Sequence, residues 1–174
     1  MPSMCRIGPN FVYMTTETRK TDIRKISTAE IGDILTGWGE PAFRTRQIQQ
    51  WIWQKSARSF AEMTNLSKTL REKLDAYFDI NPAVVDKEQV STDGTIKSRL
   101  KLHDGPLVES VLIPVPSENR YTACVSCQVG CSLNCAFCAT GKMKRVRNLD
   151  AAEIVDQVVA VNAQSEARYG ARLT

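Results

Sequence analysis

A dense cluster of cysteines constrains this chain more than any other sequence feature. A disulfide scaffold would spread its cysteines along the chain, and nothing in the sequence indicates an oxidising compartment. Five of the six cysteines instead fall within fifteen consecutive residues, and only Cys5 stands apart. We therefore expect the cluster to bind metal. Its members are Cys124, Cys127, Cys131, Cys135 and Cys138.

Three cysteines of the cluster, Cys131, Cys135 and Cys138, have the spacing C-x3-C-x2-C. A 4Fe-4S cluster has four irons, each usually held by one cysteine thiolate. Three thiolates in so short a loop would leave one iron without a protein ligand. An open iron of this kind can bind a cofactor or a substrate directly, which a cluster that only carries electrons does not need.

Two other interpretations of the cysteines remain open. A zinc ribbon could use the pairs Cys124-x2-Cys127 and Cys135-x2-Cys138. Only seven residues separate these pairs, which is short for a ribbon, and Cys131 would be left over. The second alternative is a set of buried structural thiols, which five cysteines in fifteen residues make improbable.

Composition indicates a globular protein with a mild basic bias. Of 174 residues, 43% are hydrophobic and 24% are charged, and the formal net charge is +4. This balance is compatible with nucleic-acid binding but does not establish it. No stretch approaches the roughly 18 apolar residues that a membrane span needs. The N-terminus does not resemble a signal peptide, and we expect a cytoplasmic protein without membrane contact.

The first half of the chain predicts a helical domain over residues 26–80, after a leader over residues 1–25. Ser27 and Glu30 form a capping-box pattern, and apolar residues then recur at helical spacing. The pattern predicts three short helices packed as a bundle. The pair Trp51 and Trp53 could stack on RNA, but we expect it to pack in the bundle core.

Residues 81–117 change to the two-residue period of β-strands. The Asp93-Gly94 and Asp104-Gly105 pairs are typical of hairpin turns. A three-stranded antiparallel meander is therefore expected, in which Lys97, Arg99 and Lys101 share one face of the middle strand. Its strands are 84–90, 95–102 and 107–115.

Residues 118–174 predict the first βα unit of a parallel α/β sheet. A short strand over 121–126 leads into the cysteine loop, and a helix follows, capped by Asn148 or Asp150. A turn over 163–170 and a new strand from 171 would come next. We expect the helix to bury Ile154, Val155, Val158, Val159 and Val161.

The C-x3-C-x2-C motif with an aromatic residue before its last cysteine resembles the radical S-adenosylmethionine enzymes. A longer string is more specific: residues 124–141 read CVSCQVGCSLNCAFCATG. It is similar to the adenine-C2 methyltransferases that act on large-subunit ribosomal RNA and transfer RNA. Two upstream segments resemble the same family's accessory domain: residues 40–53, EPAFRTRQIQQWIW, and residues 62–68, EMTNLSK.

The resemblance implies a set of functional residues. Cys131, Cys135 and Cys138 would ligate a 4Fe-4S cluster, whose free iron chelates S-adenosylmethionine beside Phe137. A 5'-deoxyadenosyl radical would activate a methyl group on a carrier cysteine that the family places nearer its C-terminus. Cys124 matches the cysteine that releases the product through a transient disulfide. Glu109, in the string VESV, matches the family's proton acceptor.

The resemblance also implies the architecture and the partners. We expect a mixed α+β and α/β fold: a helical accessory domain, an antiparallel β extension and the start of a partial TIM-like barrel. RNA is the expected substrate, an electron donor such as flavodoxin the redox partner, and a monomer the working state. The family's later cofactor contacts and its carrier cysteine do not occur in this sequence, so we expect an N-terminal fragment that is inactive by itself.

The strand pattern and the cysteine spacing leave alternatives open for Glu109 and Cys127. Glu109 shares a strand face with Leu107, Val111 and Ile113, and burial there would suit it to take a proton. Both faces of that strand carry apolar residues, however, so Glu109 could equally face water. Cys127 replaces the serine usual in the family and keeps the zinc interpretation open.

Basic residues follow the cysteine loop closely and could neutralise RNA phosphates, although single charge runs are usually solvated surface. His103, the only histidine, is expected on the surface. Two other functions remain open: a zinc-stabilised RNA-binding module without catalysis, and the related methyltransferase that modifies adenine C8. The basic residues after the loop are Lys142, Lys144, Arg145 and Arg147.

Overall fold

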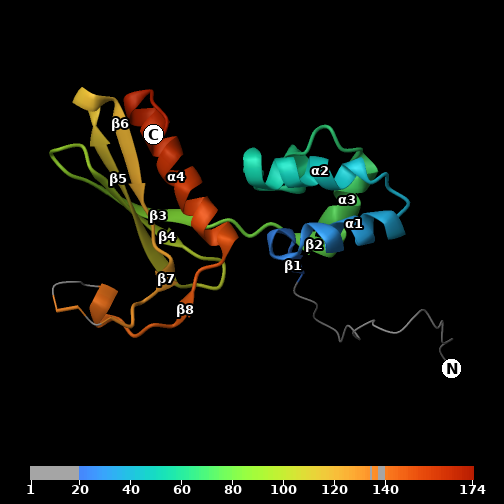
Figure 1. Ribbon diagram of the computed structural model, residues 1–174, viewed down its shortest axis with the longest axis horizontal. Coiled ribbons are helices and arrows are strands. Elements are labelled where there is room, and N and C mark those ends of the chain that lie inside the picture. The colour runs from blue at the N-terminus through green and yellow to red at the C-terminus, as the bar shows by residue number, and fades with distance from the viewer. Residues whose placement is uncertain (1–19, 134, 137–139) are drawn as a thin grey trace.

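The computed structural model describes residues 20–133, 135–136 and 140–174. A helical part comes first, and a β-sheet covered by one long helix follows it (Figure 1). Most of the predicted leader, including Cys5, lies outside the described residues. Among the helices of the described ranges, none has both the length and the apolar character of a membrane span.

The helical part contains three α-helices, as predicted, together with shorter turns. The backbone N–H of Glu30 donates to Ser27 Oγ (3.2 Å), and Glu30 Oε2 accepts from the Ser27 N–H (3.0 Å), which confirms the capping box. The elements are β1 (Thr21–Asp22), η1 (Ile23–Lys25), α1 (Thr28–Gly37), α2 (Phe43–Gln49), the π-helical turn η2 (Gln50–Gln54), η3 (Phe60–Glu62), α3 (Lys68–Tyr77) and β2 (Phe78–Asp79).

A single apolar core holds these helices together. Apolar side chains at helical spacing point inward from each helix, because burying one face is what stabilises short helices. Trp51 and Trp53 are partly buried against this core, as expected. Helix α3 begins at Lys68, because Ser67 Oγ accepts from the Leu70 N–H and caps it there. The most deeply buried members of the core include Leu35, Ile48, Met63, Leu70 and Leu74.

The sheet has four antiparallel strands rather than the three predicted. Its order is β3 (Val84–Val90), β4 (Ile96–Lys101), β5 (Leu107–Val115) and β6 (Arg120–Cys124). The strand expected to begin a βα unit is the fourth strand of the meander and pairs antiparallel with β5. The reason is the connection, since the 3-10 turn η4 (Pro116–Glu118) and one left-handed residue are too short for a parallel crossover.

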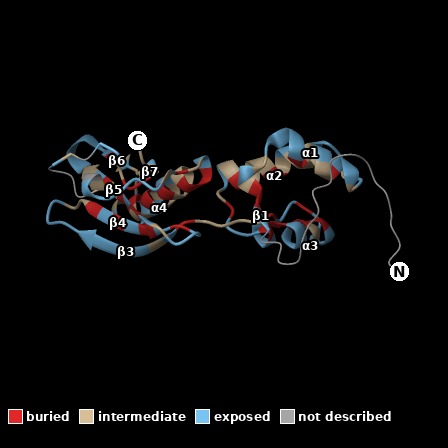
Figure 2. Cartoon of the chain, turned by 90° about the horizontal axis from the view of Figure 1, so that it is seen from below, coloured by how far each residue is buried: buried red, intermediate tan, exposed pale blue. Residues whose placement is uncertain are grey.

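Helix α4 (Ala151–Tyr169) packs across one face of the sheet (Figures 1 and 2). Its predicted capping box is confirmed, because Asp150 Oδ1 accepts from the Glu153 N–H (3.0 Å) and Glu153 Oε2 accepts from the Asp150 N–H (3.0 Å). Its predicted buried face is confirmed for Val161, which is fully buried, and wrong for Val158, which is 39% exposed. Three of the five buried residues of α4 are polar, namely Glu153, Gln157 and Ser165; the other two are Ala152 and Val161.

The end of α4 also differs from the prediction. Residues 163–169 continue the helix instead of forming a turn, because Ala, Gln, Glu and Arg in this stretch favour helix. The helix stops at Gly170, whose positive φ of 64° suits glycine. The strand expected from residue 171 is not formed, although the Thr174 N–H donates to the Tyr121 carbonyl at the edge of β6 (3.0 Å).

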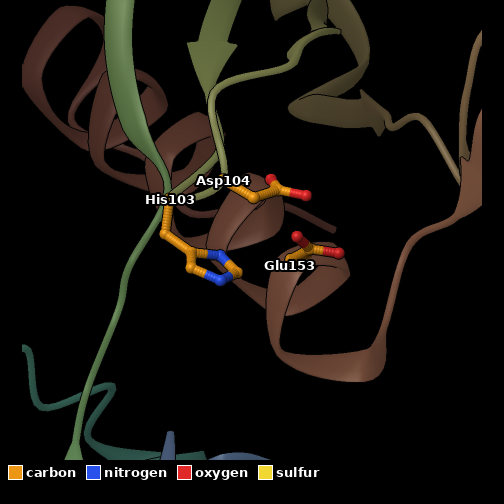
Figure 3. A group of neighbouring side chains, drawn as sticks. All are labelled: His103, Asp104 and Glu153. Carbon is orange, nitrogen blue, oxygen red and sulfur yellow. The ribbon is translucent and has the colours of Figure 1, made fainter. Parts of the chain in front are cut away.

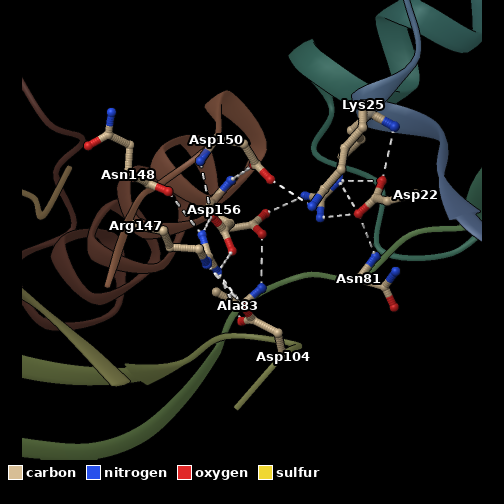
Figure 4. Close-up of polar contacts among 11 residues, drawn as sticks. Asp22, Lys25, Asn81, Ala83, Asp104, Arg147, Asn148, Asp150 and Asp156 are labelled. Atoms are coloured by element: carbon tan, nitrogen blue, oxygen red, sulfur yellow. Dashed lines mark hydrogen bonds and ion pairs between the residues drawn. The ribbon is translucent and has the colours of Figure 1, made fainter. Parts of the chain in front are cut away.

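Arg24 joins the helical part to α4 (Figure 4). Its buried guanidinium donates to Asp22 (2.9 Å) and to Asp156 of α4 (2.8 Å). The two carboxylates also accept backbone N–H groups, Asp22 from Asn81 (3.0 Å) and Asp156 from Ala83 (2.8 Å). Burial and strong ionic bonds therefore coincide at the junction between the two parts.

The carboxyl groups at this junction respond differently to burial. Burial acts to raise the pKa of Asp22, but the hydrogen bonds and charge of Arg24 outweigh it and lower that pKa below its usual value. Burial dominates at Asp156 and raises its pKa despite the bonds from Ala83 and Arg24. Arg24 therefore compensates the negative charge of both buried carboxylates.

Replacing Arg24 with Met should destabilise the fold strongly, because it leaves two buried carboxylates without their cation. We expect a loss of about 3–5 kcal/mol in the free energy of unfolding. Lys25 gives a matched control, since its ion pair with Asp150 is surface-exposed (side chain 40% exposed, against 6% for Arg24). Lys25→Met should cost less than about 1 kcal/mol. Urea unfolding measures both, and equal losses would contradict the proposed role of Arg24.

Candidate functional site

The cysteine loop is closed at its base by a short strand pair. Strand β7 (Gln128–Val129) pairs antiparallel with β8 (Arg147–Asn148). Three further backbone hydrogen bonds tie the two sides together: Leu149 N–H to the Cys127 carbonyl (2.9 Å), Val146 N–H to Val129 (2.8 Å) and Cys131 N–H to Met143 (3.2 Å). The loop also contains the 3-10 turn η5 (Thr140–Lys142). The chain thus enters and leaves the cysteine motif at a fixed place.

The described cysteines fall into two environments. Cys131 and Cys135 lie inside the loop and are partly buried, and both thiols are free. Cys124 and Cys127 precede the loop and are exposed. Cys138 and Phe137 were expected to act with the loop pair but lie outside the described residues. In the part that the structure describes, no three cysteine sulfurs converge on one point, so Cys124, Cys127 and Cys135 do not form a preassembled zinc site.

Arg147 anchors β8 to two other elements (Figure 4). It donates to Asp104 in the turn between β4 and β5 (2.8 Å) and to Glu153 of α4 (2.7 Å). The bond to Glu153, together with Asp104, raises the pKa of Arg147 further above its ordinary value. Arg147, which the sequence suggested as an RNA contact, is therefore engaged in holding the base of the loop.

One group of possible metal ligands occurs outside the cysteines. Polar atoms of His103, Asp104 and Glu153 lie within 4.8 Å of one another (Figure 3). Both carboxylates already bind the guanidinium of Arg147, so their charge is compensated. His103 is exposed, in line with its expected surface position. We read this group as the anchor of Arg147.

Gln157 fixes the segment between Cys124 and Cys127. Its side-chain oxygen accepts from the Ser126 N–H (2.8 Å) and from the Ser110 hydroxyl (2.9 Å), and its amide nitrogen donates to the Ser126 carbonyl (3.0 Å). Gln157 is fully buried. The sequence analysis missed it because a glutamine among apolar helical residues looks like a surface position; its four-residue spacing from Glu153 and Val161 was the available signal.

Glu109 and Cys124 lie on the same outer face of the sheet, the face opposite α4. In the register of β5 and β6, Val111 stands directly opposite Cys124, and Glu109 is two residues before Val111 on the same side. Ser126 Oγ also donates to the Glu109 carbonyl (2.8 Å), which ties the two strands together beyond the ladder. The structure therefore brings together the two residues to which the resemblance gave catalytic roles.

Of the two environments that the sequence left open for Glu109, the structure shows the water-facing one. Its side chain is 47% exposed and forms an ion pair with Lys97 (2.8 Å). The alternation along β5 was assigned correctly, but the other set of residues faces α4: Val108, Ser110 and Leu112 are buried. Both faces of the strand carry apolar residues, so the pattern alone could not say which one the helix would cover.

The remaining basic residues are where the sequence placed them. Lys97, Arg99 and Lys101 point outward from β4, and Ile96, Ser98 and Leu100 point inward. Arg99 is held by Asp86 on β3 (2.5 Å). Lys142, Lys144 and Arg145 are exposed on the cysteine loop.

Comparisons with known proteins agree on one family. Residues 21–80 match the family model described as the ribosomal RNA large subunit methyltransferase N-terminal domain. A probable dual-specificity RNA methyltransferase RlmN from Cytophaga hutchinsonii is 54% identical over 160 residues, or 92% of this chain and 43% of that protein. The dual-specificity RNA methyltransferase RlmN from Pelobacter propionicus is 46% identical over 151 residues, or 87% of this chain and 43% of that protein.

A solved structure supports the same relationship. The crystal structure of a radical SAM methyltransferase from Sphaerobacter thermophilus superposes with a TM-score of 0.73 at 40% sequence identity, covering 88% of this chain and 45% of that one. The mixed α/β fold described above is therefore similar to that of this methyltransferase. The chain spans less than half the length of these relatives.

Replacing Gly130 with Ala should disrupt the base of the cysteine loop. Gly130 has a positive φ of 71°, and an added Cβ would overlap the Lys144 carbonyl and lie 3.1 Å from Arg145 Cα. The backbone conformation alone should cost about 1–2 kcal/mol, and the overlap should add to that loss. Chemical unfolding and hydrogen exchange at the Val146 N–H measure the two effects.

Gly105→Ala is the matched control for this variant. Gly105 also has a positive φ (106°), but an added Cβ would meet nothing within 4 Å. The control should therefore show only the conformational cost, and the Val146 N–H should stay protected. If the two variants lose equal stability, close packing against Lys144 does not hold the loop.

Proposed function

We propose that the chain is part of an enzyme that methylates adenine C2 in RNA, because the proteins that it resembles are dual-specificity RNA methyltransferases. The proposed substrates are large-subunit ribosomal RNA and transfer RNA, and the product is 2-methyladenosine. One observation carries the proposal: the loop of Cys131, Cys135 and Cys138 follows β6 at the end of the sheet where Glu109 and Cys124 lie, and its base packs at that end through Val129 and Leu149. Metal binding and RNA chemistry would thus share one end of the sheet.

The residues of the loop fit a 4Fe-4S cluster. The two described motif thiols, Cys131 and Cys135, are free and partly buried, which suits ligands that must exchange a proton for iron and stay shielded from water. Cys138 would be the third ligand, and Phe137 would lie beside the bound S-adenosylmethionine. When bound, the cluster and this cofactor supply the radical chemistry that an electrophilic ring carbon requires.

Glu109 and Cys124 would act from the outer sheet face. Glu109 would accept the proton that leaves C2, and Cys124 would release the product by forming a disulfide with a carrier cysteine elsewhere in the enzyme. Both side chains are exposed, so an RNA base can approach them. The adenine must be unstacked or flipped to expose C2.

The basic residues of the cysteine loop would contact the RNA backbone. Lys142, Lys144 and Arg145 are exposed close to the proposed site, and neutralising phosphates supplies much of the affinity in RNA binding. An external donor such as flavodoxin would supply the electron, and the enzyme would act as a monomer.

The proposed domains follow from the same relationship: an accessory helical domain over 26–80, a β extension over 81–117, and the start of a partial TIM-like barrel over 118–174. The last boundary falls between β5 and β6, which are hydrogen-bonded neighbours. The proposed extension and barrel would therefore share a continuous sheet.

Anaerobic iron–sulfur reconstitution tests the proposed function. About four irons and four sulfides per chain are expected, because three thiolates hold one such cluster. The absorption spectrum should change when S-adenosylmethionine is added to the full-length enzyme. Stoichiometric zinc without sulfide would contradict the proposal and indicate a structural ribbon.

Single replacements by Ala at Cys131, Cys135 or Cys138 should each abolish iron loading, because each removes one of three cluster ligands. Cys127→Ser should leave the iron content unchanged and is the matched control, since Cys127 is exposed outside the loop. Iron and sulfide counts after reconstitution measure the effect. Full iron loading of the Cys135→Ala variant would refute the ligand assignment.

Glu109→Gln should slow methylation of an RNA substrate by the full-length enzyme while the iron content stays unchanged. A general acid or base typically contributes about 10²–10⁴-fold to a rate, so we expect a loss of at least about 100-fold. The amide keeps the size of the side chain but cannot accept the proton in the same way. Unchanged turnover would remove the proposed role of Glu109.

A further inference from the structure

We propose that Lys97 is a positioning residue that holds the carboxylate of Glu109 for its role as proton acceptor. The inference deepens the proposed function and rests on it. It starts from the ion pair between Lys97 Nζ and Glu109 Oε1, which is 2.8 Å long and spans two neighbouring strands. The sequence suggested Lys97 only as one of several surface cations.

The strand register shows that Glu109 pairs with a diagonal neighbour and not with the residue directly opposite it. Arg99, not Lys97, stands directly opposite Glu109 in the ladder of β4 and β5, and Lys97 stands opposite Val111. Lys97 therefore reaches diagonally along the outer face to bind Glu109. Diagonal neighbours on one sheet face lie within reach of long side chains.

Asp86 explains why the directly opposed cation does not take Glu109. The Arg99 guanidinium is bound to Asp86 on β3, with Nη2 2.5 Å and Nε 2.6 Å from the same carboxylate oxygen. Four charged side chains on three neighbouring strands thus form two ion pairs, Asp86 with Arg99 and Lys97 with Glu109. This arrangement leaves the ammonium of Lys97 as the cation that binds Glu109.

The ion pair leaves part of the Glu109 carboxylate free for the proposed chemistry. An ammonium group is a point charge that here binds one carboxylate oxygen, Oε1, and leaves the other available to accept a proton. Lys97 itself takes no proton and touches no substrate in this proposal.

The pair is not a structural support, because both side chains are 47% exposed. Exposed ion pairs contribute little to folding stability. Variants of Lys97 should therefore fold normally, and changes in activity can be assigned to the site. Unfolding midpoints of the variants would verify this before activity is compared.

The test is single-turnover methylation of an RNA substrate by the full-length enzyme that carries this sequence, together with RNA binding measured separately. Lys97→Met should slow the methylation step about tenfold, as expected when a catalytic group is misplaced, and should leave RNA affinity unchanged. Lys97→Arg keeps the charge but can bind both carboxylate oxygens, so it should recover only part of the rate. Lys101→Met is the matched control, since it removes an outward-facing lysine from the same strand, and it should leave the rate unchanged.

A double variant shows whether Lys97 acts through Glu109. On the Glu109→Gln background, Lys97→Met should cause no further loss, because the group that it positions is gone. If its full effect persists there, or if it weakens RNA binding as a phosphate contact would, the role of Lys97 is overturned. If Glu109→Gln alone leaves the rate unchanged, the proton-acceptor assignment fails first, and the role of Lys97 fails with it.

Discussion

The buried amide of Gln157 is the interaction on which the placement of the site depends. Its four hydrogen bonds reach Ser110, both backbone groups of Ser126 and the Glu153 carbonyl, so every donor and acceptor of the amide is satisfied. The two bonds to the N–H and carbonyl of Ser126 replace the backbone pairing that this residue lacks, since β6 has already ended there. Leaving such buried groups unpaired costs about 1–3 kcal/mol each. Cys124 and Cys127 flank this residue, and the Ser126 hydroxyl binds the backbone of Glu109, so one side chain of α4 sets the start of the cysteine loop relative to the outer sheet face.

Three polar residues within about one turn of α4 attach three different segments. Glu153 holds Arg147 at the base of the cysteine loop, Asp156 holds Arg24 of the helical part, and Gln157 holds the end of β6. Each contact is buried or partly buried, and burial raises the pKa of Asp156 even beside its cation. A helix with an apolar face would pack on the sheet equally well, but it would not fix the directions from which these segments arrive. The polar face of α4 therefore fixes the directions of the attached segments, and the helix loses some apolar packing against the sheet in return.

Local signals in the sequence predicted the local structure well, and long-range packing explains the failures. Both capping boxes and the ranges of β3 and β5 follow from short-range patterns, which depend on neighbouring residues alone. The buried face of α4 could not be found this way, because its Val158 faces outward while Gln157 is buried by partners 31 and 47 residues away. The side of β5 that faces α4 was ambiguous for a related reason, since apolar residues line both faces. Of the candidate site, the resemblance supplied Glu109 and Cys124, and only the register of β5 and β6 shows that they share a face.

The exposure of Glu109 changes the physical account of how it would work. The sequence left two environments open for it: water, or apolar surroundings in which removal from water would prepare a carboxylate to take a proton. In the described residues it instead stands on an open sheet face, between exposed apolar side chains and the ammonium of Lys97. Its orientation is then controlled by a specific ion pair. A base stacked over this face would itself remove water from the pair, so the low-dielectric surroundings that strengthen the charges would come with the substrate.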